Sequence, residues 1–237
     1  MYNKKKIIAV IPARGGSKGL PGKNIKNMNG KPLICWTLDK AKNSKYIDKI
    51  YVSTDSEEIA NVCEQAGVIV PELRPKELAE DNSSTVDVLL YTLKHIESKG
   101  EIYDYLLLLE PTSPLRKDND IDDMIVMGVV NPDADGVISV GKVQLEHPSI
   151  VKRITDEGYI TPYSSSNVFY YQRQLEDEAF FPYGVGYLVN IKRFIETRMI
   201  YMDKMLPYFI ERWQNFEIDD KYDFECISTI MRMEDFK

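Results

Sequence analysis

Residues 7–24, IIAVIPARGGSKGLPGKN, decide the fold of this chain. Their first part is a short apolar run, rich in β-branched residues and ended by Pro12, which is typical of a buried central strand. The second part is a loop that holds four glycines and three cations, Arg14, Lys18 and Lys23. Glycine lets backbone N–H groups approach phosphate oxygens, and the cations would neutralise their charge. The stretch therefore predicts a strand that leads into a polyphosphate-binding loop.

Two familiar glycine motifs are excluded. A P-loop requires glycine where Ser17 stands and serine or threonine where Asn24 stands. The dinucleotide fingerprint requires two glycines separated by one residue, whereas Gly15 is followed directly by Gly16 and Ser17. The loop belongs to neither class.

Length and composition describe an ordinary globular protein. The chain has 237 residues, 43% of them hydrophobic, enough for one large α/β domain with an accessory extension. No window approaches the roughly 18 uninterrupted apolar residues of a membrane helix, and the basic start lacks a cleavage pattern, so we expect neither a membrane span nor an export signal. The three cysteines are too few and too scattered for a disulfide framework or a zinc site. We therefore expect a cytoplasmic protein.

Charge is distributed unevenly. The net charge is −7, yet residues 1–38 contain eight lysines or arginines and no acidic residue. The basic end thus coincides with the predicted phosphate loop. A nucleic-acid groove would need cations spread over a whole face, whereas a free nucleotide needs only a local cluster. We expect a nucleotide ligand and no nucleic-acid partner.

Strand-like and helix-like segments alternate along the chain. The predicted strands are 7–11, 49–55, 68–70, 105–109, 136–140, 184–190 and 206–210. The predicted helices are 31–41, 56–67, 83–96, 121–130, 191–198 and 221–233. This alternation predicts an α/β fold with a mainly parallel sheet. Residues 142–183 are polar, aromatic and weakly periodic, so we interpret them as an insertion that divides one domain into 1–141 and 184–237.

Open parallel sheets bind ligands beyond the carboxyl ends of their strands. A carboxylate pair, Glu217 and Asp219, follows the last predicted strand. In an extended backbone these side chains would share a face and could hold one Mg²⁺ ion. Alternatively, the acids at 217–220 favour the N-terminus of the last helix through its dipole. Both interpretations can hold together.

The loop motif RGGSKxxPxKN at 14–24 resembles the signature of the acylneuraminate cytidylyltransferases, which make CMP-activated nonulosonic acids such as CMP-sialic acid. Two further blocks, RPxELAxD at 74–81 and PTSPLR at 111–116, resemble the same family. The resemblance implies a three-layer, Rossmann-like nucleotidyltransferase fold with a mainly parallel central sheet. It also implies a homodimer, with 142–183 as a small dimerisation and sugar-lid extension, and CTP and an acid sugar as substrates.

The resemblance also assigns roles to individual residues. The positions assigned to the nucleotide are Ala13, Arg14, Gly15, Ser17, Lys23, Asn24, Arg74 and Thr85. Arg74 and Thr85 would lie near cytosine, with Thr85 replacing a common serine; standing alone, Arg74 would suggest only a surface salt bridge. Arg14 and Lys23 would steady the leaving pyrophosphate, and Asp219, with Glu217 in place of the usual aspartate, would bind the Mg²⁺ cofactor. The expected catalytic residues are thus Arg14, Lys23 and Asp219.

The predicted sugar site departs from the family pattern. The expected sugar contacts are Glu110, Arg173, Tyr183 and Tyr187. Glu110 stands where glutamine is usual, and Phe181-Pro182-Tyr183-Gly184 replaces an Arg-x-Asn-Gly block. These changes suggest a deoxygenated or di-N-acylated nonulosonic acid, or a related 2-keto acid, rather than sialic acid. Core packing is an equally good interpretation of Phe181 and Tyr183.

The predicted reaction is attack by the anomeric hydroxyl of the acid sugar on the α-phosphate of CTP, with release of pyrophosphate. One alternative is a nucleotidyltransferase for the eight-carbon keto acid of lipopolysaccharide, against which the loop pattern weighs. Another is a non-catalytic CTP-binding paralogue. The presence of both Lys23 and Asp219 favours an active enzyme.

Overall fold

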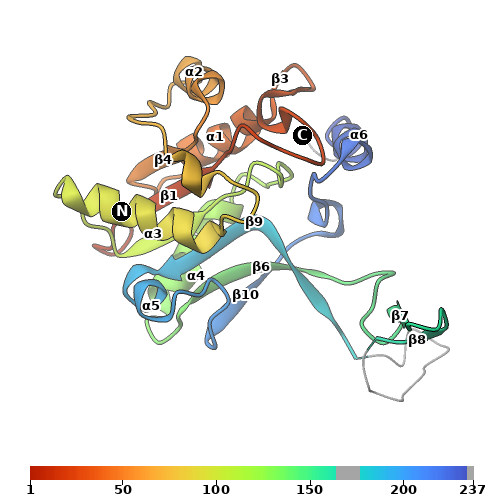
Figure 1. Cartoon of the computed structure of the whole chain (residues 1–237). Helices are drawn as coiled ribbons and strands as arrows, with labels where there is room; N and C mark the ends of the chain where they lie inside the picture. Colours follow the sequence, from red (N-terminus) through yellow and green to blue (C-terminus); the bar gives the residue numbers. More distant parts are fainter. Residues whose placement is uncertain (164–176, 234–237) are drawn as a thin grey trace.

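The computed structural model of the chain describes residues 1–163 and 177–233. A six-stranded sheet forms its centre, in the order β10-β6-β9-β5-β1-β4 (Figure 1). The strands are β1 (Ile7–Pro12), β4 (Lys49–Ser53), β5 (Tyr105–Leu108), β6 (Gly136–Lys142), β9 (Phe180–Asn190) and β10 (Met205–Phe209). β9 is antiparallel to both of its neighbours, and the other five strands run in one direction. The predicted mainly parallel α/β fold is confirmed.

The apolar run at residues 7–11 forms a central strand, β1. β1 pairs in parallel with β4 on one side and with β5 on the other. Ile7, Ile8, Val10 and Ile11 are fully buried, and alternate residues contribute to the cores on opposite faces of the sheet. A strand with no polar face is stable only where helices cover both sides, so the run required a three-layer arrangement.

Helices cover both faces of the sheet. The helices α1 (Leu33–Asn43), α2 (Glu57–Gln65) and α4 (Asp120–Val130) pack on one face. The helices α3 (Thr85–Ser98) and α5 (Ile191–Thr197) pack on the other. Beyond the sheet, α6 (Lys221–Ile230) packs against a small hairpin of β2 (Asn27–Met28) and β3 (Lys31–Pro32). Short 3-10 turns lie at η1 (Lys23–Ile25), η2 (Lys76–Leu78) and η4 (Arg212–Gln214).

Side-chain caps fix where the helices that border the site begin. Ser56 accepts a hydrogen bond from the backbone of Ile59 at the start of α2, and Ser84 does the same for Asp87 at the start of α3. The helices that these caps begin were predicted from the sequence over 56–67 and 83–96.

The predicted strand at 68–70 is wrong. Val68 and Val70 are buried against the core, and Ile69 is 76% exposed, so the alternation typical of a strand is present. However, β4 is the edge of the sheet, and residues 68–70 pair with no described strand. Alternating burial alone does not create a strand without a hydrogen-bonded partner.

The described part of the predicted insertion projects from the body of the molecule (Figure 1). β6 and β9 pair as far as Lys142 and Phe180, and the hairpin of β7 (Lys152–Ile154) and β8 (Ile160–Pro162) lies beyond them. The predicted boundaries, 142 and 183, therefore fall within β6 and β9. In the described part of the chain, none of the helices has the length and apolarity needed to cross a membrane.

Candidate active site

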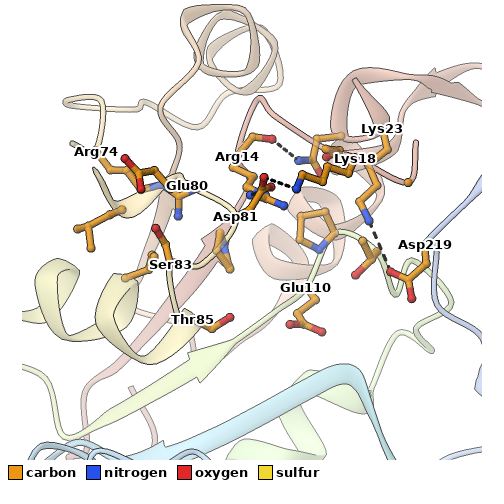
Figure 2. A pocket seen from close by; sticks show the side chains of 18 residues that line it. Arg14, Lys18, Lys23, Arg74, Glu80, Asp81, Ser83, Thr85, Glu110 and Asp219 are labelled. Atoms are coloured by element: carbon orange, nitrogen blue, oxygen red, sulfur yellow. Dashed lines mark hydrogen bonds and ion pairs between the residues drawn. The ribbon is translucent and has the colours of Figure 1, made fainter. Parts of the chain in front are cut away.

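A cavity of about 570 Å³ opens at the carboxyl ends of β1 and β5 and beside the N-terminus of α3 (Figure 2). This volume is in the range of small-molecule sites. Its lining comes from the end of β1 at Pro12, the glycine loop, residues within 74–88, residues 110–112 and Asp219. The sequence-predicted residues that line it are Arg14, Ser17, Lys23, Asn24, Arg74, Thr85, Glu110 and Asp219.

Backbone contacts hold the glycine loop in shape. Ala13 donates its N–H to the carbonyl of Ser53, and Gly15 donates its N–H to Oδ1 of Asp55, each at 2.9 Å. Neither Ala13 nor Gly15 lines the cavity. Asn24 is buried and donates from Nδ2 to the carbonyl of Arg14 at 3.0 Å. Ala13 and Gly15 thus anchor the loop to the end of β4, and their contact with nucleotide stays a prediction.

An aspartate that the sequence motifs did not mark as a site residue pairs with two of the loop cations. Asp81 accepts from Nη1 of Arg14 at 3.0 Å, and its second oxygen is 2.6 Å from Nζ of Lys18 (Figure 2). The hydrogen bond from Lys18, with that from Arg14, holds the pKa of the Asp81 carboxyl below its usual range. The sequence could have pointed to Asp81, because this residue is the last of the second family-like block, RPxELAxD at 74–81.

Lys23 lies deeper in the cavity, with its side chain 17% exposed. Its ammonium group donates to the carbonyl of Ile218 at 2.7 Å and lies 3.9 Å from Oδ1 of Asp219. Burial lowers the pKa of Lys23, and the negative charge of Asp219 opposes that shift. Lys23 therefore places a positive charge between the glycine loop and the 217–220 segment.

The far end of the cavity is formed by Arg74 and the start of α3. Arg74 is only 7% exposed, so the surface-salt-bridge alternative is wrong. Its backbone N–H donates to Thr54, its Nη2 lies 4.0 Å from Oδ1 of Asp55, and its buried Nε has no hydrogen-bond partner in the described structure. Burial lowers the pKa of Arg74, and Asp55 opposes that shift. A buried guanidinium with a spare donor is suited to bind a polar ligand edge.

Glu217 and Asp219 occupy different surroundings. Oε1 of Glu217 accepts hydrogen bonds from the hydroxyl of Ser113 at 2.9 Å and from the N–H of Gly184, and Glu217 does not line the cavity. The Asp219 side chain is 94% exposed and lies at the cavity edge beside Lys23. The two predicted metal ligands therefore have unequal access to the cavity.

The helix-terminus interpretation of the acids at 217–220 holds for Asp220. Asp220 caps α6 and forms a capping box with Asp223, whose carboxylate accepts from the N–H groups of Asp219 and Asp220. This box fixes the backbone that presents Asp219 at the cavity edge.

The donor set at this edge fits magnesium. Magnesium is usually bound by one or two carboxylates together with substrate phosphates, rather than by a complete protein cage. In the described part of the chain, no cluster of three or more His, Cys, Asp or Glu residues is placed to hold a metal. Asp219 offers an exposed carboxylate beside the glycine loop, and Glu217 is held by its own hydrogen bonds. Asp219 is therefore the better ligand candidate.

The predicted sugar residues are only partly brought together. Glu110 lines the cavity, and burial, assisted by the charge of Glu217, raises the pKa of its carboxyl to about 7. Tyr183 packs its ring against Phe181 at 5.1 Å, and Tyr187 is buried against Tyr201; neither tyrosine lines the cavity. Phe181 is itself 52% exposed, so the core interpretation does not fit it. Arg173 lies outside the described residues.

Arg116, in the third family-like block, supports the site without lining the cavity. Arg116 is 1% exposed and donates to the carbonyls of Glu110, Gly184 and Val185 and to the hydroxyl of Thr37. Its burial lowers its pKa to about 10, while Asp120 acts in the opposite direction. This side chain ties the exit of β5 to β9 and α1, and so fixes where Glu110 enters the cavity.

Sequence reasoning assigned no role to two further members of the lining, Glu80 and Ser83. Glu80 and Ser83 lie in the irregular segment between η2 and α3, which has no periodic pattern from which an orientation could be predicted. Only the packing of this segment over the glycine loop places them in the cavity.

Comparison with known proteins agrees with this geometry. The protein family described as Cytidylyltransferase matches residues 8–228. The chain is 34% identical to the CMP-N,N'-diacetyllegionaminic acid synthase of Legionella pneumophila, over 96% of this chain and 97% of that protein. It is 33% identical to an N-acylneuraminate cytidylyltransferase of Streptococcus agalactiae, over 92% of this chain and only 52% of that longer protein.

The fold has a solved counterpart. A CMP:2-keto-3-deoxy-manno-octonic acid synthetase, solved in complex with CTP, superimposes with a TM-score of 0.70 over 95% of this chain and 98% of the other. At 17% identity, this likeness shows the fold alone. The family match, by contrast, covers most of the chain and includes all three motif blocks. The chain belongs to the cytidylyltransferase family.

Proposed function

We propose that this protein transfers CMP from CTP to the anomeric hydroxyl of a nonulosonic acid and releases pyrophosphate. One observation carries the proposal: a single cavity joins a cationic glycine loop at one side to the carboxylates Glu110 and Asp219 at the other. The cationic side suits a triphosphate, and the remaining volume would accept a second substrate. Relatives of this chain are named as a CMP-N,N'-diacetyllegionaminic acid synthase, an N-acylneuraminate cytidylyltransferase and a pseudaminic acid cytidylyltransferase.

The proposed reaction is direct transfer between the two substrates. In the described part of the chain, no cysteine or histidine lines the cavity. The sugar oxygen would form a bond to the α-phosphorus while the bond from that phosphorus to the bridging oxygen breaks. Arg14 and Lys23 would neutralise the charge that develops on the departing pyrophosphate, and Arg74 and Thr85 would hold the base. Positioning and charge neutralisation would then provide the rate enhancement.

Magnesium is the proposed cofactor, with Asp219 as its main protein ligand. When bound, the ion would neutralise phosphate charge and lower the pKa of an oxygen that coordinates it. The chain's own contribution is to hold Asp219 at the cavity edge through the α6 capping box and to keep Lys23 beside it.

We further propose a di-N-acylated acceptor of the legionaminic type. Glu110 lines the cavity together with Asp219, and it stands where glutamine is usual in the family that the motifs resemble. The full-length match to a legionaminic acid synthase supports this choice. The eight-carbon acid is the second candidate, although only likeness of fold favours it.

A cytoplasmic homodimer is the proposed state of the enzyme. The extension that projects from the body carries several large exposed apolar side chains: Leu145, Ile154, Tyr159, Ile160 and Tyr163. A second copy of the chain would remove these side chains from water. Light scattering of the purified protein tests this, with a monomer at micromolar concentration as the contradicting result.

The deciding experiment is pyrophosphate release from CTP and Mg²⁺ with four acceptors in parallel: legionaminic-type, sialic, pseudaminic-type and eight-carbon acids. We expect the highest kcat/KM with the legionaminic-type acid. Release with the eight-carbon acid alone would overturn the acceptor class. Tight CTP binding without release from any acceptor would overturn the enzymatic proposal and favour a nucleotide-binding paralogue.

A further inference from the structure

The two outermost cations of the glycine loop share one carboxylate. Asp81 contacts Nη1 of Arg14 through one oxygen at 3.0 Å and Nζ of Lys18 through the other at 2.6 Å. All three side chains border the same cavity (Figure 2). A carboxylate held between a guanidinium and an ammonium group occupies the kind of position that a phosphate oxygen would take.

The segment that carries Asp81 is anchored at both of its ends. Ser83 donates its hydroxyl to the carbonyl of Glu77 at 2.8 Å, and Ser84 caps α3. The carbonyl of Ala79 also accepts from Nη1 of Arg14, at 3.4 Å. The fold therefore delivers Asp81 to the loop cations, from a position 67 residues further along the chain than Arg14.

Nothing else in the described structure holds the Asp81 carboxylate. Its only hydrogen bonds and ion pairs there are those to Arg14 and Lys18, and its side chain is half exposed. The carboxylate could swing into water without leaving a buried charge unpaired. Its neighbour Glu80 also lines the cavity, yet forms no ion pair with a described residue.

We propose that Asp81 is an internal counter-ion that takes the place of a phosphate oxygen between Arg14 and Lys18, and that polyphosphate must displace it to bind. This inference rests on the proposed function in that CTP is the displacing ligand. Displacement reduces the affinity of any ligand that contacts Arg14 and Lys18, since part of its binding free energy is spent on separating the ion pairs. A ligand without phosphates would leave Asp81 in place.

Asp81 would therefore lower the affinity for polyphosphates without altering recognition of the base. The same competition would assist release of pyrophosphate, because the carboxylate can return to the two cations as the product leaves. Asp81 is then a device that resets the phosphate subsite after each turnover.

The test compares Asp81→Asn with Glu80→Gln by calorimetry, without metal, using three probes: cytidine, CTP and inorganic tripolyphosphate. We expect Asp81→Asn to tighten CTP and tripolyphosphate roughly twofold to tenfold, the scale of exposed ion pairs, and to leave cytidine unchanged. Glu80→Gln removes one negative charge from the same cavity without freeing a cation, so it should have a smaller effect. The gain from Asp81→Asn should shrink at about 0.5 M salt, because exposed pairs are screened.

The outcomes are separable. Weaker tripolyphosphate binding by Asp81→Asn would mean that Asp81 orients the cations, and would overturn the inference. Equal tightening by both variants would also overturn it, since general electrostatic attraction would then suffice. Tripolyphosphate that tightens as expected, together with CTP that binds neither variant, would support the counter-ion role and contradict the proposed nucleotide instead.

Discussion

Arg116 donates from Nη2 to the carbonyl of Gly184 at 2.7 Å, and thereby joins the exit of β5 to β9. The same nitrogen reaches the carbonyl of Glu110 at 2.8 Å, so one buried guanidinium holds together both strands beside Glu110. The site is thus supported by an arginine that is not itself part of its lining.

Arg116→Ala should lower the free energy of unfolding by about 3–5 kcal/mol, because it leaves three buried or partly buried carbonyl groups without their donor and Asp120 without a nearby positive charge. Urea denaturation checks this. Arg193→Ala is the control, since Arg193 is half exposed and its pair with Asp135 should contribute less than about 1 kcal/mol. Similar losses for both variants would contradict the supporting role of Arg116.

Gly19 allows the glycine loop and the 217–220 segment to approach each other. A Cβ atom at Gly19 would lie 2.2 Å from the backbone carbonyl oxygen of Asp219, whereas a Cβ atom at Gly16 would meet nothing within 4 Å. Gly19→Ala must separate Lys23 from Asp219, and a displacement of this size can reduce kcat/KM by about a hundredfold. Gly16→Ala, in the same loop, should reduce it far less. Steady-state kinetics of the two variants measure the difference, and equal effects would contradict this role of Gly19.

Substitution of Glu217 should mainly reduce stability, whereas substitution of Asp219 should mainly change the dependence of the rate on Mg²⁺. Glu217→Ala removes the acceptor for Ser113 and for the N–H of Gly184, and should cost about 1–3 kcal/mol of stability. Asp219→Ala, at an exposed position, should change stability by less than about 0.5 kcal/mol. Its expected effect is a rise in the Mg²⁺ concentration needed for half-maximal rate. Titration of Mg²⁺ in the activity assay, beside urea denaturation, measures both, and the reverse pattern would make Glu217 the principal ligand.

Glu110 should make stability depend on pH in the metal-free protein. Its carboxyl has a pKa of about 7 in the folded chain, while an ordinary glutamate titrates near about 4.3. Between these values the unfolded chain has released this proton and the folded chain has not, so the contribution of Glu110 to stability falls as the pH rises. Glu110→Gln removes this slope, and should gain roughly 1–3 kcal/mol relative to the wild type between pH 5 and pH 8.

Urea denaturation in EDTA across this pH range measures the difference for Glu110. Glu97→Gln, on the exposed part of α3, controls for the loss of a carboxylate. A constant difference between Glu110→Gln and the wild type at all pH values would show that Glu110 is ionised throughout.

The layers of the fold and the position of the glycine loop follow from local features of the sequence. The run at 7–11 has no polar face, and the caps Ser56 and Ser84 are local signals that act within one helical turn. The loop motif required no distant partner to be recognised. Features whose physical cause lies within a few residues could therefore be predicted from the amino-acid sequence.

Contacts between side chains that are distant in sequence depend instead on how the elements pack. Residues 68–70 show the burial pattern of a strand, but they lie beyond the edge strand and have no partner in the described sheet. Glu217 and Asp219 differ by two positions, yet one binds Ser113 and Gly184 and the other faces solvent. The pairing of Asp81 with Arg14 joins segments 67 residues apart. Such contacts form only when separate elements pack together, so they cannot be predicted from local periodicity.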